Sequence, residues 1–248
     1  MKVSVITVCY NSAATIEATI RSVVEQDYKN IEYILVDGKS SDDTLNIIAN
    51  YHPYISKIIS EKDDGIYFAI NKGIATASGD VIAILHADDF YTDANVISKV
   101  VKTFEAKNTD TVYGDLQYVD RENTAKITRH WKSGEYTPGL FLKGWMPPHP
   151  AFFVRKKCYD QFGIFNTALR SAADYEMMLR LLHKHHCSAA YIPEVLVKMR
   201  VGGKSNASIM NRLKANREDK KAWEINGLKP GLFTFIRKPL SKLGQFFK

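Results

Sequence analysis

Short apolar runs alternate with amphipathic segments through the first hundred residues. Runs of mainly β-branched residues predict four buried strands, at residues 3–8, 31–36, 58–59 and 81–85. Between them, apolar residues recur three or four positions apart, which indicates helices such as the one carrying Ile66, Ile70 and Ile74. Because strands that alternate with helices pair in parallel, this pattern predicts a doubly wound α/β sheet.

The strict alternation ends near residue 110. The second half predicts an irregular strand pair within 112–129, a loop marked by glycine and proline at 134–150, and helices after Lys156 and Ala172. We expect this half to share the sheet of the first.

Polar, small and acidic residues collect where the predicted strands end. Doubly wound sheets bind ligands at the carboxyl ends of their strands. The segments at those ends are 9–11, 37–38, 61–65 and 86–89. This edge of the sheet is therefore the expected ligand site.

Two adjacent carboxylates, Asp88 and Asp89, directly follow the apolar run 81–85. Carboxylate oxygens are ligands that Mg²⁺ and Mn²⁺ prefer, and a substrate diphosphate commonly completes their coordination. The same residues are candidates to cap a helix predicted at 94–104. The spacing alone leaves the metal site and the helix cap open.

The strand end at Asp37 also has two interpretations. Asp37 could accept hydrogen bonds from a uracil or a ribose, with Ser40 as a weaker candidate beside it. Ser41 and Asp42 fit the cap of the helix that follows. Both interpretations can hold for different residues of this stretch.

Three charged residues carry weaker predictions. Lys72 could face a phosphate, downstream of Asp64, although a lone helix lysine is usually solvated. Asp174 begins an apolar helix, where it is either a first-turn acid without a function or a general base beside an acceptor hydroxyl.

Composition indicates a folded protein of a reducing compartment. Hydrophobic residues make up 45% and charged residues 25% of the 248 residues, values typical of globular proteins. Three distant cysteines without C-x-x-C spacing argue against a disulfide framework and a zinc ribbon. The first apolar run is too short for a signal peptide, and no run approaches the roughly 20 residues that span a bilayer. We expect a cytoplasmic protein with at most a peripheral membrane attachment.

The excess positive charge lies in the last fifth of the chain. From Lys198 onward 13 basic residues face three acidic ones, whereas the remainder has 21 basic and 24 acidic residues. A nucleic-acid-binding protein usually spreads basic residues over a docking face, so we disfavour that class. From Lys229 the tail combines five basic residues with recurring Leu, Ile and Phe, which is typical of a helix on an anionic membrane. A helix packed on the protein itself and bent at Pro239 is the alternative.

Seven motifs in a fixed order resemble glycosyltransferase family 2, whose members are inverting enzymes with the GT-A fold. In the first half the resemblance is carried by Val5–Asn11, Val36–Thr44, Asp64–Gly73 and Ala87–Asp89. In the second half it is carried by His149–Phe153, Ala173–Glu176 and Gly202–Ser205.

The resemblance implies a Rossmann-like, doubly wound mixed sheet with helices on both faces. It implies a nucleotide-sugar-binding half at 1–110 and an acceptor-binding half of the same domain at 111–205. Beyond the resemblance, we expect a basic C-terminal helical tail at 206–248.

The resemblance also implies roles for single residues. The nucleotide-sugar would contact Thr7, Cys9, Asn11, Asp37, Ser40, Asp64, Lys72, Asp88 and His149. Asp89, together with Asp88, would hold Mn²⁺ or Mg²⁺, and Asp174 would be the catalytic base. One position departs from the pattern, because the metal motif usually opens with an acid where this chain has His86. A buried structural His86 and a contact of His86 with the nucleotide or metal both stay open.

The implied reaction is transfer of a sugar, of the hexosyl or N-acetylhexosaminyl class, from a nucleotide-sugar to a hydroxyl of a glycan or lipid-linked acceptor in cell-surface polysaccharide biosynthesis. UDP is the favoured nucleotide, and the absence of a Q-x-x-R-W motif favours non-processive transfer. A nucleotidyltransferase is an alternative, although no glycine-rich phosphate loop follows the first strand. A non-catalytic nucleotide-sugar-binding protein is the other.

Overall fold

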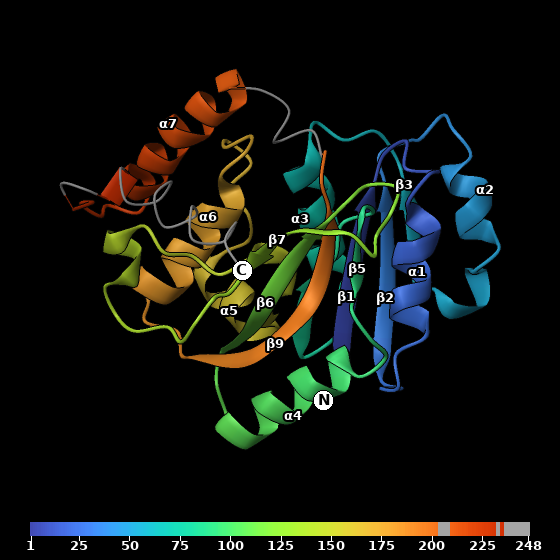
Figure 1. Cartoon of the computed structure of the whole chain (residues 1–248), viewed down its shortest axis with the longest axis horizontal. Helices are drawn as coiled ribbons and strands as arrows, with labels where there is room; N and C mark the ends of the chain where they lie inside the picture. Colours follow the sequence, from blue (N-terminus) through green and yellow to red (C-terminus); the bar gives the residue numbers. More distant parts are fainter. Residues whose placement is uncertain (203–208, 232–233, 236–248) are drawn as a thin grey trace.

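A computed structural model describes residues 1–202, 209–231 and 234–235, and the side chains of residues 209–216 are not described. Its centre is one nine-stranded sheet in the order β3-β2-β1-β4-β8-β6-β9-β5, with β7 paired to β6 (Figure 1). The strands are β1 (Val3–Cys9), β2 (Ile31–Asp37), β3 (Lys57–Ser60), β4 (Val81–Ile84), β5 (Asp89–Tyr91), β6 (Thr111–Val119), β7 (Ile127–Trp131), β8 (Phe152–Arg155) and β9 (Ala189–Arg200).

The first four strands pair in parallel, as their alternation with helices predicts. β1 lies between β2 and β4, with Val3 opposite both Ile31 and Val81, and β3 extends the sheet beyond β2. β8 then joins β4 in the antiparallel direction, and β6 pairs antiparallel with β8 but parallel with β9. The doubly wound mixed α/β sheet of the sequence prediction is confirmed.

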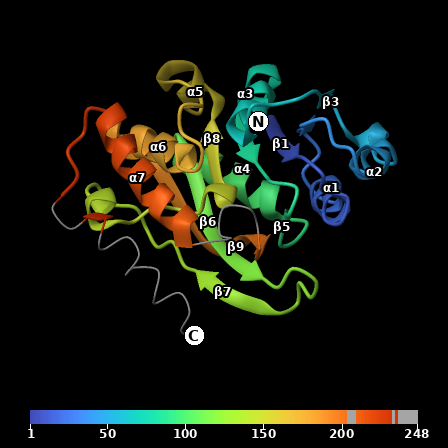
Figure 2. The same ribbon diagram turned by 90° about the horizontal axis from the view of Figure 1, so that it is seen from above.

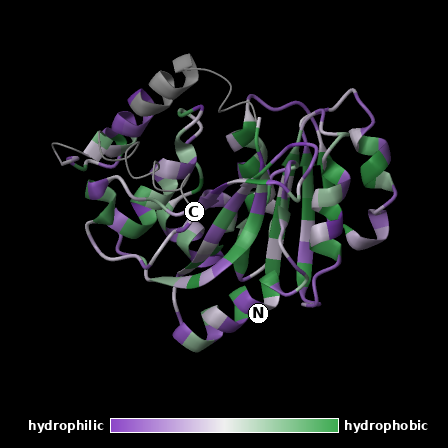
Figure 3. Cartoon of the chain, viewed as in Figure 1, coloured by the Kyte–Doolittle hydropathy of each residue, from purple (hydrophilic) through white to green (hydrophobic). Residues whose placement is uncertain are grey.

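Alternate residues of the strands face two separate helical layers. Ile6, Ile34 and Ile82 belong to a core with α3 (Ile66–Thr76), α5 (Lys156–Phe162) and α6 (Ala173–Met178). Their odd-numbered neighbours face α1 (Ile16–Val24), α2 (Thr44–Ala49) and α4 (Val96–Lys107). Figure 2 shows these two groups of helices on opposite sides of the sheet, and Figure 3 shows hydrophobic residues concentrated along its central strands.

The second half contains the predicted strand pair as β6 and β7, with a register shift between Tyr118 and Val119. The predicted loop at 134–150 includes two short 3₁₀ helices, η2 (Leu140–Lys143) and η3 (His149–Ala151). The predicted helices appear as α5 and α6. α6 continues into a π-helical turn, η4 (Leu179–Lys184), a distortion that occurs often at functional sites.

α7 (Ile209–Ile225) lies beside α6 in Figures 1 and 2. In the part of the chain that the structure describes, no helix is long and apolar enough to cross a membrane. Lys229 and Phe235 are described, but most of the predicted membrane-binding segment, at 232–233 and 236–248, lies outside the described residues, as does Gly203–Ser205 of the last motif.

Candidate active site

The sheet topology brings two sequence-distant histidines to the same edge. β8 runs antiparallel to β4, with Ile82 opposite Val154, so β8 begins where β4 ends. His86 follows β4, and His149 lies in η3 immediately before β8. The Nε2 atoms of the two rings are 2.7 Å apart.

Asp174, in the first turn of α6, is held at this edge by two side chains. His149 Nδ1 lies 3.2 Å from its Oδ2, and the Tyr67 hydroxyl donates a hydrogen bond of 3.3 Å to its Oδ1. Burial raises the pKa of Tyr67, so this residue stays a neutral phenol. The predicted base therefore has a fixed orientation between α3 and η3.

One proton on each imidazole satisfies this chain of contacts. His149 Nδ1–H then donates to Asp174, and His86 Nε2–H donates to the free Nε2 of His149. His86 Nδ1 is left as a lone pair, which agrees with its burial without a hydrogen-bond partner. Burial and the nearby His149 lower the pKa of His86 to about 3, so His86 is neutral. His86 is thus half-buried, with the ring of His149 as its hydrogen-bond partner.

The acid pair after β4 has one buried and one accessible member. Asp89 is fully buried, and neither of its carboxylate oxygens has a hydrogen-bond partner. Burial, and then the charge of Asp88, raise the pKa of Asp89 well above its usual value, while Arg200 opposes the shift. Asp88 is half-buried, and its carbonyl oxygen accepts a hydrogen bond of 3.0 Å from Arg200.

These carboxylates fit a divalent cation better than a helix cap. The N-cap of α4 is Asn95, so the alternative that Asp88 or Asp89 caps this helix is wrong. An unpartnered buried carboxylate is costly, and a cation would compensate its charge. The described part of the chain brings no three His, Cys, Asp or Glu side chains together as a metal site. A cation at Asp88 and Asp89 would need further oxygen ligands, which a substrate diphosphate can supply.

Asp37, Ser40 and Asn11 form one network at the ends of β1 and β2. The buried Asp37 carboxylate accepts hydrogen bonds from the hydroxyls of Ser40, at 2.5 Å, and Ser60, at 2.7 Å. Ser40 Oγ in turn accepts the backbone N–H of Asn11 at 2.8 Å. Cys9 Sγ lies 3.7 Å from Asp37, and burial raises the pKa of this thiol, which keeps it neutral.

Thr7 is separated from this network. It is fully buried on the odd-numbered face of β1, and its Oγ1 lies 3.2 Å from the Tyr33 hydroxyl among the residues that pack on α1 and α4. Thr7 shares this face with Cys9 but lies two residues before the end of β1, and its hydroxyl is already hydrogen-bonded to Tyr33. The structure thus does not bring Thr7 together with the other predicted contacts.

Lys72 is paired with carboxylates of the preceding loop. Its Nζ lies 2.6 Å from Asp63 and 2.7 Å from Glu61. Asp64 instead is exposed and lines a cavity of about 450 Å³ between the start of α3 and the loop before α6. Tyr67 also lines this cavity, which therefore adjoins the contact between Tyr67 and Asp174.

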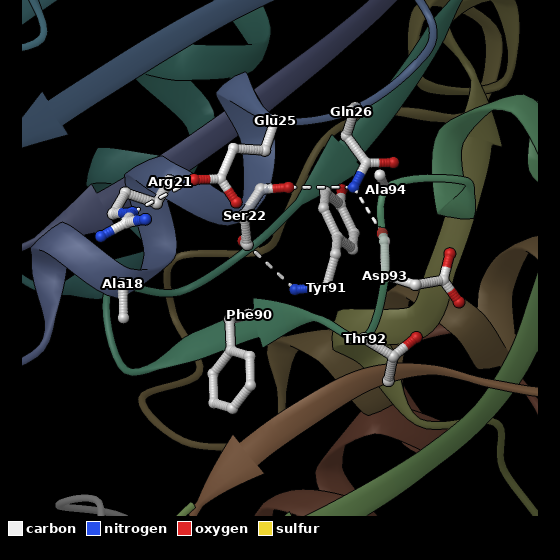
Figure 4. Close-up of a pocket in the computed structure, with 10 residues that line it drawn as sticks. All are labelled: Ala18, Arg21, Ser22, Glu25, Gln26, Phe90, Tyr91, Thr92, Asp93 and Ala94. Carbon is white, nitrogen blue, oxygen red and sulfur yellow. Dashed lines mark hydrogen bonds and ion pairs between the residues drawn. The ribbon is translucent and has the colours of Figure 1, made fainter.

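A second cavity, of about 380 Å³, lies between α1 and β5 (Figure 4). None of the predicted site residues lines it. Its lining residues are joined by structural hydrogen bonds, including those from Gln26 to the carbonyl oxygens of Ser22 and Asp93. We assign it no part in the site.

Sequence reasoning missed three residues that the geometry places at the site. Tyr67 and Ser60 contact Asp174 and Asp37, and Arg200 reaches the acid pair from the end of β9. Tyr67 lies inside the motif Asp64–Gly73, but the sequence does not reveal that its hydroxyl contacts Asp174. Arg200 is 112 residues from Asp88, and no local spacing reveals that contact.

Comparison with known protein families decides the class. The sequence model described as "Glycosyl transferase family 2" matches residues 4–175, which is more than half of the chain. The chain belongs to glycosyltransferase family 2. This assignment makes it a transferase and confirms the resemblance carried by the motifs.

Named relatives of this family 2 glycosyltransferase include two mycobacterial proteins. An uncharacterized glycosyltransferase of Mycobacterium tuberculosis is 31% identical over 180 residues, which cover 72% of this chain and 68% of the relative. A PGL/p-HBAD biosynthesis glycosyltransferase of Mycobacterium bovis is 28% identical over 211 residues, which cover 83% of this chain and 80% of the relative.

Solved structures confirm the GT-A fold of this family 2 member. S. aureus TarS 1–349 in complex with UDP-GlcNAc superposes with a TM-score of 0.69 at 17% identity, covering 91% of this chain and 65% of that chain. The chain thus spans less than two thirds of the TarS fragment. Mannosyltransferase PcManGT from Pyrobaculum calidifontis, in complex with GDP-Man and Mn²⁺, gives a TM-score of 0.66 at 20% identity. The superposition covers 96% of this chain and 67% of PcManGT.

Proposed function

We propose that this glycosyltransferase moves a hexosyl or N-acetylhexosaminyl group from a nucleotide-sugar, with UDP favoured, to a hydroxyl of a glycan or lipid-linked acceptor. The observation that carries the proposal is the Asp174 carboxylate, fixed by His149 and Tyr67 at the sheet edge that also holds Asp88 and Asp89. A general base and an acid pair at one edge are what inverting transfer requires.

Asp174 takes the proton of the acceptor hydroxyl as that oxygen attacks the anomeric carbon. The bond from this carbon to the nucleoside diphosphate breaks in the same step, so the anomeric configuration inverts. His149 donates to Oδ2 and Tyr67 to Oδ1, and both contacts keep the carboxylate aimed until the acceptor arrives.

Asp88 and Asp89 would hold a divalent cation, Mn²⁺ or Mg²⁺, which when bound stabilises the charge on the departing diphosphate. The unpartnered oxygens of buried Asp89 support this assignment. PcManGT, a structural neighbour, is described with Mn²⁺.

We assign the donor to the half formed by residues 1–110 and the acceptor to residues 111–205. The network of Asn11, Asp37 and Ser40 would bind the nucleoside, and Cys9 would lie beside it. Asp64 and His149 would face the sugar and diphosphate, whereas Lys72 would act there only by exchanging its contacts with Asp63 and Glu61. The relative in PGL biosynthesis supports an acceptor destined for the cell surface.

A donor screen tests this function directly. UDP-, GDP- and dTDP-sugars are compared for thermal stabilisation of the protein with Mn²⁺, because a ligand that binds the folded state raises its apparent stability. We expect one UDP-sugar to stabilise the protein most, and UDP to be released when a suitable acceptor is added. Release of pyrophosphate from a sugar phosphate and UTP would instead indicate a nucleotidyltransferase.

We also propose that the basic segment from Lys229 to the end attaches the cytoplasmic enzyme to an anionic membrane. Each basic residue near such a surface contributes about 1 kcal/mol. Deletion from Lys229 onward should abolish sedimentation with anionic liposomes and leave donor hydrolysis intact. Unchanged liposome binding, or unfolding of the shortened chain, would contradict the anchor and favour a helix packed on the enzyme.

A further inference from the structure

The first turn of α6, which follows the loop 170–172, has no side-chain N-cap. Ala172 occupies the N-cap position and offers no side-chain hydrogen bond to the first turn. An unsatisfied helix start is normally stabilised by Ser, Thr, Asp or Asn at this position. Asp174 lies two residues farther on, so whatever fixes this loop also fixes the predicted base.

Glu218 of α7, 44 residues from Asp174 in sequence, instead holds the backbone that leads into this helix. Its carboxylate accepts three successive backbone N–H groups, from Arg170 at 3.1 Å, Ser171 at 2.7 Å and Ala172 at 3.0 Å. The Ser171 hydroxyl donates a fourth hydrogen bond at 2.9 Å. Although burial alone raises the pKa of Glu218, these hydrogen bonds hold it below its usual value, so the carboxylate is charged.

Two further hydrogen bonds hold α7, and the residue that directly follows it, against α6. The fully buried Trp223 donates its indole N–H to the Tyr175 hydroxyl at 2.9 Å, and Asn226 Nδ2 donates to Glu176 at 3.0 Å. Tyr175 and Glu176 directly follow Asp174 in α6. α7 thus contacts both sides of the predicted base along the chain, yet it lies outside the residues matched by the family, 4–175.

We propose that Glu218 is a positioning residue of this enzyme, which holds the loop 170–172 and through it sets the place of the Asp174 carboxylate. The proposal rests on the function of Asp174 as the base. Glu218 lies far along the chain from this loop, and three backbone N–H groups of the loop donate to it beside the single Ser171 hydroxyl, so most of its hold is on the backbone. When a catalytic base is displaced by about 1 Å, the rate of the reaction can fall roughly a hundredfold.

The test compares Glu218→Ala with two variants near the end of α7, one at Glu224 in the helix and one at Asn226 just after it. Glu224→Ala removes an exposed carboxylate, and Asn226→Ala removes a docking contact without touching the loop. At 25 °C we expect Glu218→Ala to lower kcat about 10- to 100-fold with an unchanged KM for the donor. Glu224→Ala should behave as wild type, and Asn226→Ala should lower the melting temperature but keep kcat. Glu218→Gln, which keeps one acceptor oxygen, should recover part of kcat.

Hydrogen exchange separates this proposal from the function on which it rests. Amides of residues 170–176 should exchange faster in Glu218→Ala than in Glu224→Ala, whatever reaction the enzyme performs. Unchanged exchange and wild-type kcat in Glu218→Ala would overturn the positioning role, and so would an equal loss of kcat in Asn226→Ala. An active Asp174→Asn variant would overturn the assignment of the base, and the proposal with it, even if exchange is accelerated.

Discussion

Asp174→Asn should abolish most transfer activity while donor binding stays nearly unchanged. The amide keeps the shape of the carboxylate but cannot accept the proton of the acceptor hydroxyl. Loss of a general base costs about 10²- to 10⁴-fold in rate. We expect kcat to fall by this factor, with a donor dissociation constant within about twofold of wild type. UDP release and calorimetric donor binding measure the two quantities separately.

Asp160→Asn is the matched control for this substitution. Asp160 is an exposed acid of α5 that pairs with Lys156 across one helical turn, so its amide variant should have wild-type kcat. A further comparison is His149→Ala, which removes the contact at Asp174 Oδ2 and should lower kcat less than Asp174→Asn. Wild-type turnover of Asp174→Asn would end its assignment as the base.

Periodicity predicted the strands that have a continuous, mainly apolar run and missed those that are very short or interrupted by polar residues. β1, β2 and β4 are mainly apolar, because both faces of these strands are covered by helices. β5 and β8 have three and four residues, too few to show a period. β9 has twelve, but Pro193 and Glu194 interrupt its apolar pattern, and its pairing with β6 shifts register opposite this region.

The motifs predicted which residues gather at the sheet edge but not how they contact one another. The strand-end rule correctly brought Asn11, Asp37 and Ser40 together, since β1 and β2 are parallel neighbours. It could not reveal that His86 meets His149, because that contact depends on β8 reversing direction beside β4. Nor could it reveal Glu218, whose partners lie 46 to 48 residues away.

Binding of UDP together with Mn²⁺ should stabilise the wild-type enzyme, and this stabilisation should depend on the acid pair. At a ligand concentration of 100 times the dissociation constant the gain is about 2.7 kcal/mol. For a chain of this size that corresponds to a rise in melting temperature of about 5–10 °C. Asp88→Asn and Asp89→Asn should each lose most of the part that requires Mn²⁺, which thermal unfolding with UDP alone and with UDP plus Mn²⁺ measures.

The buried member of the pair makes this test specific. Neither oxygen of Asp89 has a hydrogen-bond partner, so Asp89→Asn removes no hydrogen bond from the metal-free protein. Its melting temperature without metal should therefore be close to that of wild type, while the gain from Mn²⁺ disappears. Asp160→Asn should keep the full gain. If Asp89→Asn retains the Mn²⁺-dependent stabilisation, or if transfer continues undiminished in excess chelator, the acid pair does not hold a metal.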